Sequence, residues 1–435
     1  MTYSDDVGSL QDLQELNWVP HYFSFRFSKT LFPGTPDAPL TSNNRVTIDF
    51  TPIPDESNVP EVVFGGLGNH ESVIGNSVKL INGKVAGDIL GGFSLYEESS
   101  RNTVEIEGSE VGGDVYGGYS NYGESSGNTV EIKSGTVNNA FGGNSLDEES
   151  SGNIVRIEGG RVNYNVRGGR ADLDSNKNIV EIKGGTVGIH VIGGESENGS
   201  ATGNIVTLNG DDLTTFGAYY STLYGGYRSY GVGSDIFTGN TLNKNNASIV
   251  PHVVNFEFVN FGYTGEAKID DLDTSPGASQ SAGVTLDTGA NDIVFKGVIK
   301  GDGALTKKGA GTLALTGENT FTENLVIEGG LIQFEKDTNL GASNKIVLKG
   351  GGLQWGGDEN NILDISGRLD ALGAGGGIFD TNNRTVEFET TLTGEGGITK
   401  QGAGVLILTA ENEYKGGTTI LGDISGRGGD SLINF

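Results

Sequence analysis

The stretch Asn102-Thr103-Val104-Glu105-Ile106, followed by Val111 and then by Val115-Tyr116-Gly117-Gly118-Tyr119-Ser120, contains a pattern that the chain repeats. Its five-residue opening recurs, with similar residues, from five further asparagines: Asn76, Asn128, Asn153, Asn178 and Asn204. Successive asparagines are 26, 26, 25, 25 and 26 residues apart. A fixed period of this length is typical of a repeat architecture, in which each repeat forms one structural unit.

Each repeat predicts short β-strands. Val104 and Ile106 alternate with polar residues, which is the period-two pattern of a strand with one buried face. Val111 and Val115 lie on two further short apolar pieces, so we expect about three strands per repeat. We expect Gly117-Gly118 to form a corner, because glycine tolerates backbone conformations that a side chain would hinder.

Strands this short need neighbours, and stacking one coil on the next at the roughly 4.8 Å spacing of paired strands supplies them. We therefore predict an all-β fold, a right-handed parallel β-helix (β-solenoid), because parallel crossovers are overwhelmingly right-handed. The aligned asparagines are expected to form an amide ladder. The predicted core contains Val104, Ile106, Val111, Val130, Ile132, Val155, Ile157, Val180 and Ile182.

The composition excludes several partners and sites. The 435 residues carry 56 acidic and 28 basic side chains, a formal net charge of −28. This balance disfavours nucleic acids and anionic membranes, both of which need Lys and Arg clusters. Without cysteine there are no disulfides or thiolate metal sites. The histidines, His21, His70, His190 and His252, show no metal-binding spacing. We therefore expect no nucleic acid partner, no metal and no cofactor.

Residues 1–60 differ from the repeats, since they contain seven of the nine prolines. We predict a weak amphipathic helix over 9–18 and an aromatic strand over 21–27, with Val46, Ile48 and Phe50 in a first, irregular coil. We interpret the segment as an irregular N-terminal cap over the end of the solenoid. A binding head is the alternative.

Residues 61–245 form the predicted array of 25–26 residue repeats, and an acidic loop follows each Gly-Gly. The first three loops contain Glu97, Glu98, Glu124, Asp147, Glu148 and Glu149. In stacked coils these carboxylates would form a ridge, and carboxylate oxygens suit Ca²⁺. Two interpretations stay open, a ridge that binds Ca²⁺ weakly and a solvated edge that binds no ion. The glycine-aspartate repeat of Ca²⁺-binding solenoids is missing.

After Asn204 an insertion interrupts the period and brings five tyrosines close together in the sequence: Tyr219, Tyr220, Tyr224, Tyr227 and Tyr230. An insertion in a solenoid usually emerges on one face, often the binding face. Aromatic rings suit contacts with sugars or proteins. We predict a ligand-binding site at these tyrosines, and the alternative is that the rings only pack on the coil edge.

The C-terminal part carries a second, longer repeat. Residues 246–280 form a predicted transition, with a strand over 253–261. In the segment 281–435, residues 301–321 return as residues 394–414, an offset of 93 residues. The shared pattern alternates strands with glycine-rich and asparagine-containing turns.

The run Leu305-Thr306-Lys307-Lys308-Gly309-Ala310-Gly311-Thr312-Leu313, with Glu318-Asn319-Thr320-Phe321, resembles the passenger-associated strand repeat of bacterial autotransporters. The likeness covers roughly 281–421, and 61–245 in style only. It implies a right-handed β-helix passenger on the surface of a Gram-negative cell or secreted from it. The family's signal peptide and C-terminal membrane barrel are not found in this sequence. We therefore expect an exported fragment, linked to a membrane only through that absent barrel.

We predict a non-enzymatic passenger that acts as an adhesin or structural stalk and binds a protein or glycan of a host-cell or bacterial surface. Self-association is left open. The alternative is a β-helix enzyme that degrades polysaccharides, which would need one unrepeated constellation of carboxylates with a basic residue on one face. The acidic residues of this chain instead recur in repeated loops.

Overall fold

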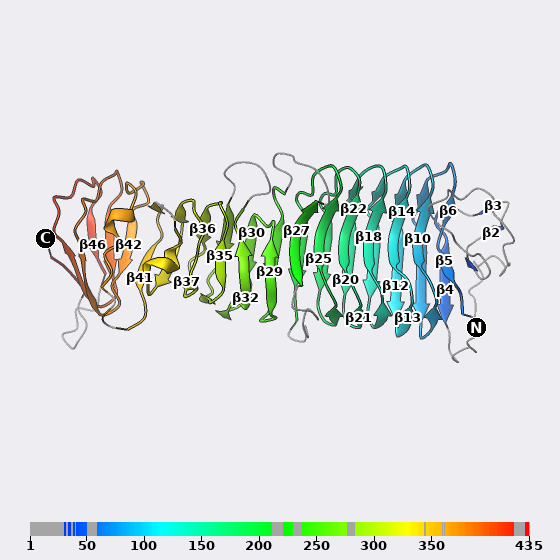
Figure 1. The fold of residues 1–435 in the computed structure, drawn as a ribbon, viewed down its shortest axis with the longest axis horizontal. Coiled ribbons are helices and arrows are strands. Elements are labelled where there is room, and N and C mark those ends of the chain that lie inside the picture. The colour runs from blue at the N-terminus through cyan, green and yellow to red at the C-terminus, as the bar shows by residue number, and fades with distance from the viewer. Residues whose placement is uncertain are drawn as a thin grey trace. The chain divides into compact units, whose positions relative to one another are not determined.

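The structure, a computed structural model, describes residues 30–31, 34–35, 38–39, 41–49, 59–210, 221–228, 237–275, 283–342, 345–358, 360, 362–421 and 431–434. Within these residues there is no α-helix, and two short 3-10 helices, η2 (Asp337–Leu340) and η3 (Ser366–Arg368), interrupt an all-β chain. The chain divides into two compact units, residues 1–241 and residues 242–435 (Figure 1).

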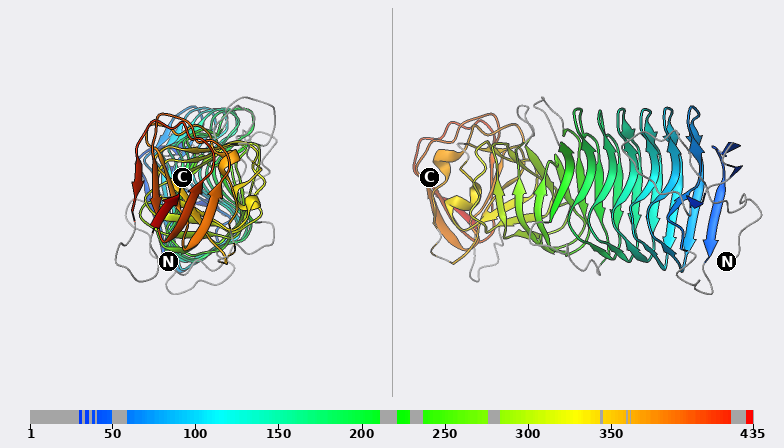
Figure 2. Two further views of the ribbon diagram at one scale, coloured as in Figure 1. Left: turned by 90° about the vertical axis from the view of Figure 1, so that its left-hand side faces the viewer. Right: turned by 45° about the vertical axis from the view of Figure 1, so that its right-hand side comes forward.

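The first unit is a stack of β-coils. One coil contains β14 (Val115–Ser120), β15 (Ser125–Ser126), β16 (Thr129–Ile132) and β17 (Gly135–Val137). Each strand pairs in parallel with its counterpart in the next coil, so the strands of the first unit follow one another in chain order (Figure 2). The predicted parallel β-helix is confirmed. The prediction of about three strands per repeat is confirmed for the coil made of β22 (Val166–Ala171), β23 (Ile179–Ile182) and β24 (Thr186–Val187). The coil that starts at β14 has a fourth strand, which was missed because the serine pair that forms β15 carries no apolar signal.

The strands of the first unit form four parallel sheets and one short hairpin. The Gly-Gly sheet contains β1 (Thr30–Leu31), β5 (Val62–Phe64), β6 (Leu67–Gly68), β10 (Ile89–Ser94), β14, β18 (Ala140–Ser145), β22 (Val166–Ala171), β25 (Val191–Ser196) and β27 (Thr222–Arg228). The Val/Ile sheet contains β4 (Arg45–Asp49), β8 (Ser77–Ile81), β12 (Thr103–Glu107), β16, β20 (Ile154–Ile157), β23 (Ile179–Ile182) and β26 (Ile205–Leu208). The serine sheet contains β7 (Val73–Ile74), β11 (Ser99–Ser100), β15 and β19 (Ser150–Ser151). The turn sheet contains β9 (Lys84–Val85), β13 (Ser109–Val111), β17, β21 (Arg161–Val162) and β24 (Thr186–Val187). The hairpin pairs β2 (Gly34–Thr35) with β3 (Ala38–Pro39).

The interior of the first unit consists of columns of identical or similar side chains. Val104 pairs with Val130 and Ile106 with Ile132, an offset of 26 residues that matches the sequence period. The predicted core residues are confirmed, since each is at most 1% exposed: Val104, Ile106, Val111, Val130, Ile132, Val155, Ile157, Val180 and Ile182.

The asparagine ladder is also confirmed. The Asn102 backbone N–H donates to Asn128 Oδ1 at 2.9 Å, and Asn128 N–H donates to Asn153 Oδ1 at the same distance. Asn128 Nδ2 donates to Asn153 Oδ1 at 3.1 Å and to the Ser99 carbonyl at 2.9 Å. Each rung therefore supplies a hydrogen bond to backbone N–H groups that the β-ladders leave without a partner.

The Gly-Gly pairs lie inside strands, which corrects the prediction that they form corners. Gly117 and Gly118 belong to β14, and neither has a positive φ. Glycine is required there for space. A Cβ on Gly118 would collide with the Asn128 amide, and one on Gly117 with the Gly142 carbonyl. The ladder and the glycines are therefore a matched pair, in which the amide occupies the volume that a side chain would fill.

The predicted first coil begins as expected, because β4 pairs in parallel with β8 and buries Val46 and Ile48. Phe50, the predicted helix over 9–18 and the strand over 21–27 lie outside the described residues. The cap and the four-segment division of the chain stay predictions.

The coils of the second unit are built from a different set of strands. Its two longer sheets contain β28 (Thr241–Lys244), β30 (Phe258–Phe261), β33 (Val284–Asp287), β36 (Leu305–Lys308), β38 (Leu325–Ile327) and β40 (Ile346–Leu348), and β31 (Gly265–Glu266), β34 (Ile293–Phe295), β37 (Thr312–Leu315), β39 (Leu331–Phe334), β41 (Gly352–Trp355), β42 (Gly377–Asp380), β44 (Ile398–Gln401) and β46 (Thr418–Ile420). The remaining strands are β29 (Val250–Val254), β32 (Ile269–Asp273) and β35 (Val298–Lys300), and β43 (Arg384–Phe388), β45 (Gly404–Leu408) and β47 (Ser431–Asn434). The strand predicted over 253–261 is two strands, because Asn255 adopts a φ of 60° between them.

The second unit packs aromatic rings and lysines inside its coils. Leu305 pairs with Leu325 and Leu325 with Ile346, so the coils are 20 and 21 residues long. Trp355 is fully buried, with ring centres 5.2 Å from Phe334 and 5.9 Å from Phe388. Lys307 and Lys400, at equivalent places in the two copies of the longer repeat, are also fully buried.

Candidate binding surface

The Gly-Gly sheet of the first unit has a second, outward face. Val115 of β14 is fully buried, and a Cβ on the neighbouring inward glycine Gly91 would meet the core residue Val104. Side chains alternate along a strand, so the residues beside these inward positions point away from the core. Charged residues occupy the same register positions in later coils, which agrees with an outward direction. We call this surface the outer face.

The register arranges the outer face in two columns. The first column contains Leu90, Tyr116, Phe141, Arg167, Ile192 and Tyr224. The second contains Phe93, Tyr119, Asn144, Arg170, Glu195 and Tyr227. Every member lies directly before or after a Gly-Gly pair. That position in the repeat is the sequence signal that would have identified the face.

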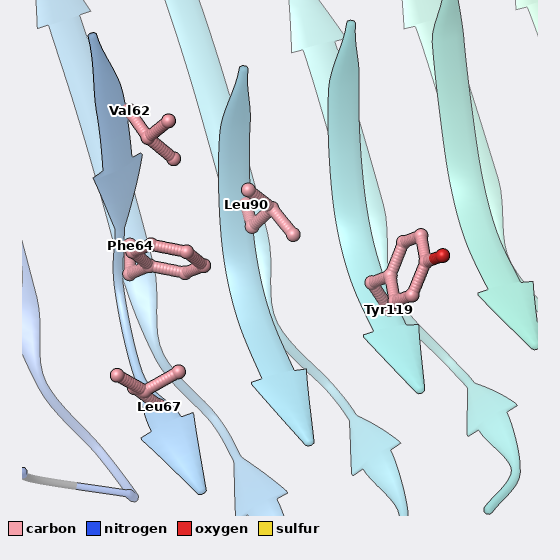
Figure 3. Close-up of a cluster of buried hydrophobic side chains, with 5 residues drawn as sticks. All are labelled: Val62, Phe64, Leu67, Leu90 and Tyr119. Atoms are coloured by element: carbon pink, nitrogen blue, oxygen red, sulfur yellow. The ribbon is translucent and has the colours of Figure 1, made fainter. Parts of the chain in front are cut away.

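The N-terminal end of the outer face is hydrophobic. Figure 3 shows five of its side chains on three neighbouring stretches of the sheet: Val62, Phe64, Leu67, Leu90 and Tyr119. They are 3–7% exposed, and Phe93, Tyr116 and Leu146 pack against them. The outer face is thus closely packed from one coil to the next at this end.

Aromatic rings stack along the columns. The rings of Tyr116 and Phe141 lie 4.8 Å apart and nearly parallel, and the Arg167 guanidinium lies 5.1 Å from the Phe141 ring centre. Stacking and cation–π contact both use the ring faces, so these rings present their edges outward. Burial raises the pKa of the Tyr116 and Tyr119 phenols, so both stay protonated.

The middle of the outer face is a network of ion pairs. Arg167 Nε donates to Glu195 Oε2. Arg170 Nε lies 3.7 Å from Glu195 Oε1, and Arg170 Nη2 donates to Glu197 Oε1 at 2.8 Å. Glu195 is buried, while one third of the Arg170 side chain is exposed. The two arginines and two glutamates balance each other, so this part of the face carries no net charge.

The predicted tyrosine site is described in part. Tyr224 and Tyr227 lie on β27, where they end the two columns, with ring centres 5.0 Å apart in a T-shaped arrangement. Both are partly exposed. Tyr219, Tyr220 and Tyr230 lie outside the described residues. The structure therefore brings two of the five predicted residues onto the outer face, beside charged residues that the tyrosine pattern does not predict.

His190 adjoins this end of the face. Its Nδ1 accepts a hydrogen bond from the Thr222 N–H at 3.2 Å, and its ring centre lies 5.7 Å from that of Tyr224. Burial first, and the nearby Arg167 second, lower its pKa. The imidazole is therefore neutral at pH 7, with Nδ1 free to accept that hydrogen bond.

A separate acidic edge runs along the loops between the Gly-Gly sheet and the serine sheet. Glu98, Glu124, Glu149 and Asp174 occupy one register position, because the backbone carbonyl of each accepts from the residue after its counterpart in the preceding coil. Burial raises the pKa of Glu149, and the charges of Asp174, Glu124 and Glu148 raise it further. Across the described residues no group of three His, Asp or Glu side chains is placed to hold a metal ion.

Exposed aromatic rings accompany the acidic edge. The rings of His70 and Tyr96 stack at 4.4 Å, and those of Tyr96 and Tyr122 at 5.2 Å. Tyr96 is 43% exposed and Tyr122 46%. This stack is a surface feature that follows the coil period rather than a pocket.

Comparison with known proteins agrees with the longer repeat of the second unit. The model of a family described as the passenger-associated-transport-repeat matches residues 305–334 and 398–422. Over 195 residues, 42% of this chain, the sequence is 31% identical to the "Adhesin BmaC autotransporter" of Brucella suis biovar 1 (strain 1330). The match spans 5% of that relative's length. No helix among the described residues is both long and apolar enough to cross a membrane. The chain is therefore a parallel β-helix whose second unit carries passenger-associated transport repeats, and part of it is similar to an autotransporter adhesin.

Proposed function

We propose that this passenger segment is an adhesin without enzymatic activity, and that the outer face of its first unit binds a protein or glycan on a host-cell or bacterial surface. Its passenger-associated transport repeats and its similarity to an autotransporter adhesin support a place on the Gram-negative cell surface or secretion from it. The observation that carries the proposal is the concentration of Tyr, Phe and Arg side chains in two aligned columns.

The residue types support binding by this face. Tyrosine and arginine supply a large share of binding energy at protein interfaces, because they combine apolar area with hydrogen-bonding groups. Tyr224, Tyr227 and Arg170 offer both, and each is partly exposed. The coils beneath hold their backbone in fixed register, so a ligand would meet a preformed surface. The matching relative is named an adhesin.

The contacts of the carboxylates favour binding over catalysis. Glycoside hydrolysis needs two carboxylates that flank the scissile bond. On the outer face Glu195 and Glu197 are engaged with Arg167 and Arg170. In the second unit His252, Asp271 and Lys300 form a cluster, in which Lys300 Nζ lies 3.3 Å from Asp271 Oδ1. That cluster contains a single carboxylate, so it lacks the acid and base pair of a glycosidase.

The test is an adhesion assay with the 435-residue chain coupled to beads. The double variant Arg170→Ala, Tyr227→Ala removes exposed groups of the outer face. We expect it to reduce bead attachment to epithelial cells and to bacteria by about tenfold or more, because a loss of about 1.4 kcal/mol of binding free energy lowers affinity tenfold and two anchor residues together supply at least that much. Glu131→Ala, on the solvent side of the Val/Ile sheet, is the matched control and should leave attachment unchanged. Equal attachment by the double variant and the parent, with equal melting temperatures, would refute the assignment of the outer face.

A further inference from the structure

Two asparagine side chains on the outer face each have a buried amide oxygen without a hydrogen-bond partner. Asn144 is 2% exposed and Asn121 is 8% exposed, yet neither Oδ1 has a hydrogen-bond partner. Buried polar atoms are nearly always paired, because leaving one unpaired is costly. The ladder asparagines of the same coils are fully bonded, as Asn128 and Asn153 show. The missing hydrogen-bond partners are therefore specific to Asn121 and Asn144 and are not shared by the ladder asparagines.

Both amides belong to the middle of the outer face. Asn144 pairs with Tyr119 on one side and with Arg170 on the other. Asn121 follows Tyr119 by two residues, and its register neighbour is Leu146, which packs with Tyr119 on the same face. The two amides thus lie in adjacent coils, and Asn144 is the register neighbour of the Arg170 guanidinium. Arg170 is one-third exposed, so its side chain can shift without disturbing the coil beneath.

The charges around the amides select a neutral ligand. Arg167 and Arg170 are already balanced by Glu195 and Glu197. The whole chain carries a net charge of −28, which repels polyanions such as uronate or sialate polymers. A hydroxyl group both donates and accepts hydrogen bonds, so it satisfies an amide in either orientation and accepts from arginine as well.

We propose that the middle of the outer face binds a neutral oligosaccharide, whose hydroxyl groups pair with Asn121, Asn144 and Arg170 and whose apolar ring edge contacts Tyr227. Tyr227 lies three strands beyond Asn144 in the same column. Three strand spacings are about 14 Å, so a ligand that reaches both groups is a chain of several sugars rather than a single one. The proposal rests on the proposed function and names the class of ligand.

The test uses isothermal titration calorimetry with the 435-residue chain. The probes are neutral hexasaccharides of glucose, mannose, galactose and xylose, with a hexagalacturonate and the free monosaccharides for comparison. We expect at least one neutral hexasaccharide to bind, and the hexagalacturonate and monosaccharides to bind at least about tenfold more weakly. Absence of binding by all neutral hexasaccharides, or tighter binding of the hexagalacturonate, would overturn the proposal.

Variants separate a ligand-binding role from a structural one. Asn144→Leu keeps the shape of the side chain and removes the unmet amide, so its melting temperature should equal or exceed that of the parent. The same variant should bind the hexasaccharide at least about tenfold more weakly. Asn153→Leu, in the bonded ladder, should lower the melting temperature instead. If Asn144→Leu binds the hexasaccharide as tightly as the parent, the amide is not part of the site.

The calorimetry and the adhesion assay can reject the two proposals separately. Beads that attach to cells through Arg170 and Tyr227 while the chain binds no neutral hexasaccharide would leave the adhesive function in place. That result would reject the glycan and point to a protein ligand on the same face.

Discussion

Asn128 shows how one residue satisfies three demands of a coil. Its Oδ1 accepts from the backbone of the preceding rung, and its Nδ2 donates both to the next rung and to a serine carbonyl. Its amide also occupies the space above Gly118. Because a polar side chain in a dry core is costly unless it is fully bonded, the repeat tolerates an asparagine only where all these partners recur.

The core positions should be intolerant of charge. Val130 is fully buried between Val104 and Val155. Val130→Asp places an unpaired carboxylate there, and we expect it to lower the free energy of unfolding of the first unit by roughly 4 kcal/mol or more. The matched control is Thr129→Asp, one residue earlier on the outward side of the strand, which should cost less than about 1 kcal/mol. Urea unfolding measures both. Equal costs at the two positions would mean that the assigned register is wrong.

A double-mutant cycle can test the steric match between Gly118 and Asn128. Gly118→Ala should destabilise the first unit, since its methyl group meets the Asn128 amide, and Asn128→Ala should do so by removing ladder bonds. In the double variant the methyl group gains the vacated space, so the combined loss should fall short of the sum by about 1 kcal/mol or more. Gly169→Ala with Asn128→Ala is the control pair, because Gly169 faces the Asn178 amide, to which Asn128 makes no direct hydrogen bond. Additivity in both pairs would contradict the steric explanation.

At the scale of the element, the two units close their coils with different chemistry. The first unit uses the asparagine ladder. In the second unit Lys307 Nζ donates to the carbonyls of Lys308, Gly309 and Gly329 at 2.7, 2.9 and 3.1 Å. Lys400 Nζ donates likewise to those of Gln401 and Gly402. A buried ammonium thus holds a glycine turn in each copy of the longer repeat.

Because of these lysines, the free energy of unfolding should change with pH in the alkaline range. Burial lowers the pKa of Lys307 and of Lys400 to about 8, from the ordinary value of 10.5. Between pH 8 and 10.5 the unfolded chain therefore binds more protons than the folded one, so the free energy of unfolding rises with pH across that window and is flat below it. We expect a rise of about 1 to 3 kcal/mol per lysine. Urea unfolding at several pH values measures it.

The control for the pH effect is Lys307→Met, which keeps the length of the side chain and does not titrate. Its unfolding free energy should rise less steeply than that of the parent over the same pH window. If the unfolding free energies of the parent and of Lys307→Met rise equally with pH, other groups, such as exposed tyrosines, cause the increase.

The sequence predicted the elements with a strong apolar period and missed those whose cause is three-dimensional. The Val and Ile columns and the ladder followed from alternation and spacing. The strands of the serine sheet were not predicted because Ser99 and Ser125 are polar. Both are nevertheless fully buried, since the Ser99 hydroxyl donates to the Gly92 carbonyl and the Ser125 hydroxyl to the Gly118 carbonyl. The outer face escaped because its members change from Tyr116 through Arg167 to Tyr224, so position rather than residue type repeats.

At the scale of the whole molecule, negative charge is the dominant feature, and the acidic edge concentrates part of it. The loop carboxylates stack in register, but none of the described groups is arranged as a metal site. Exposed like charges at strand spacing repel modestly and are screened over about 8 Å at physiological ionic strength. Added salt should therefore stabilise the chain through screening.

The two interpretations of the acidic edge differ in their response to Ca²⁺. Because no convergent ligand set is present among the described residues, we expect equal melting temperatures in CaCl2 and NaCl solutions of equal ionic strength. Differential scanning calorimetry measures this, with MgCl2 as a further control. A higher melting temperature in CaCl2 alone would favour the ion-binding ridge.

The direction of the inter-coil hydrogen bonds has a mechanical consequence for the first unit. Each coil is held to the next by bonds that run along the stack, so tension along that direction loads the coils in series. The weakest junction then opens first and releases one coil of 26 residues, or roughly 90 Å of extended chain. Optical-tweezer stretching should give a series of such steps, whereas a single large rupture would contradict it. A cell tethered through the proposed adhesin would then lengthen its attachment by increments under flow before the bond to its ligand fails.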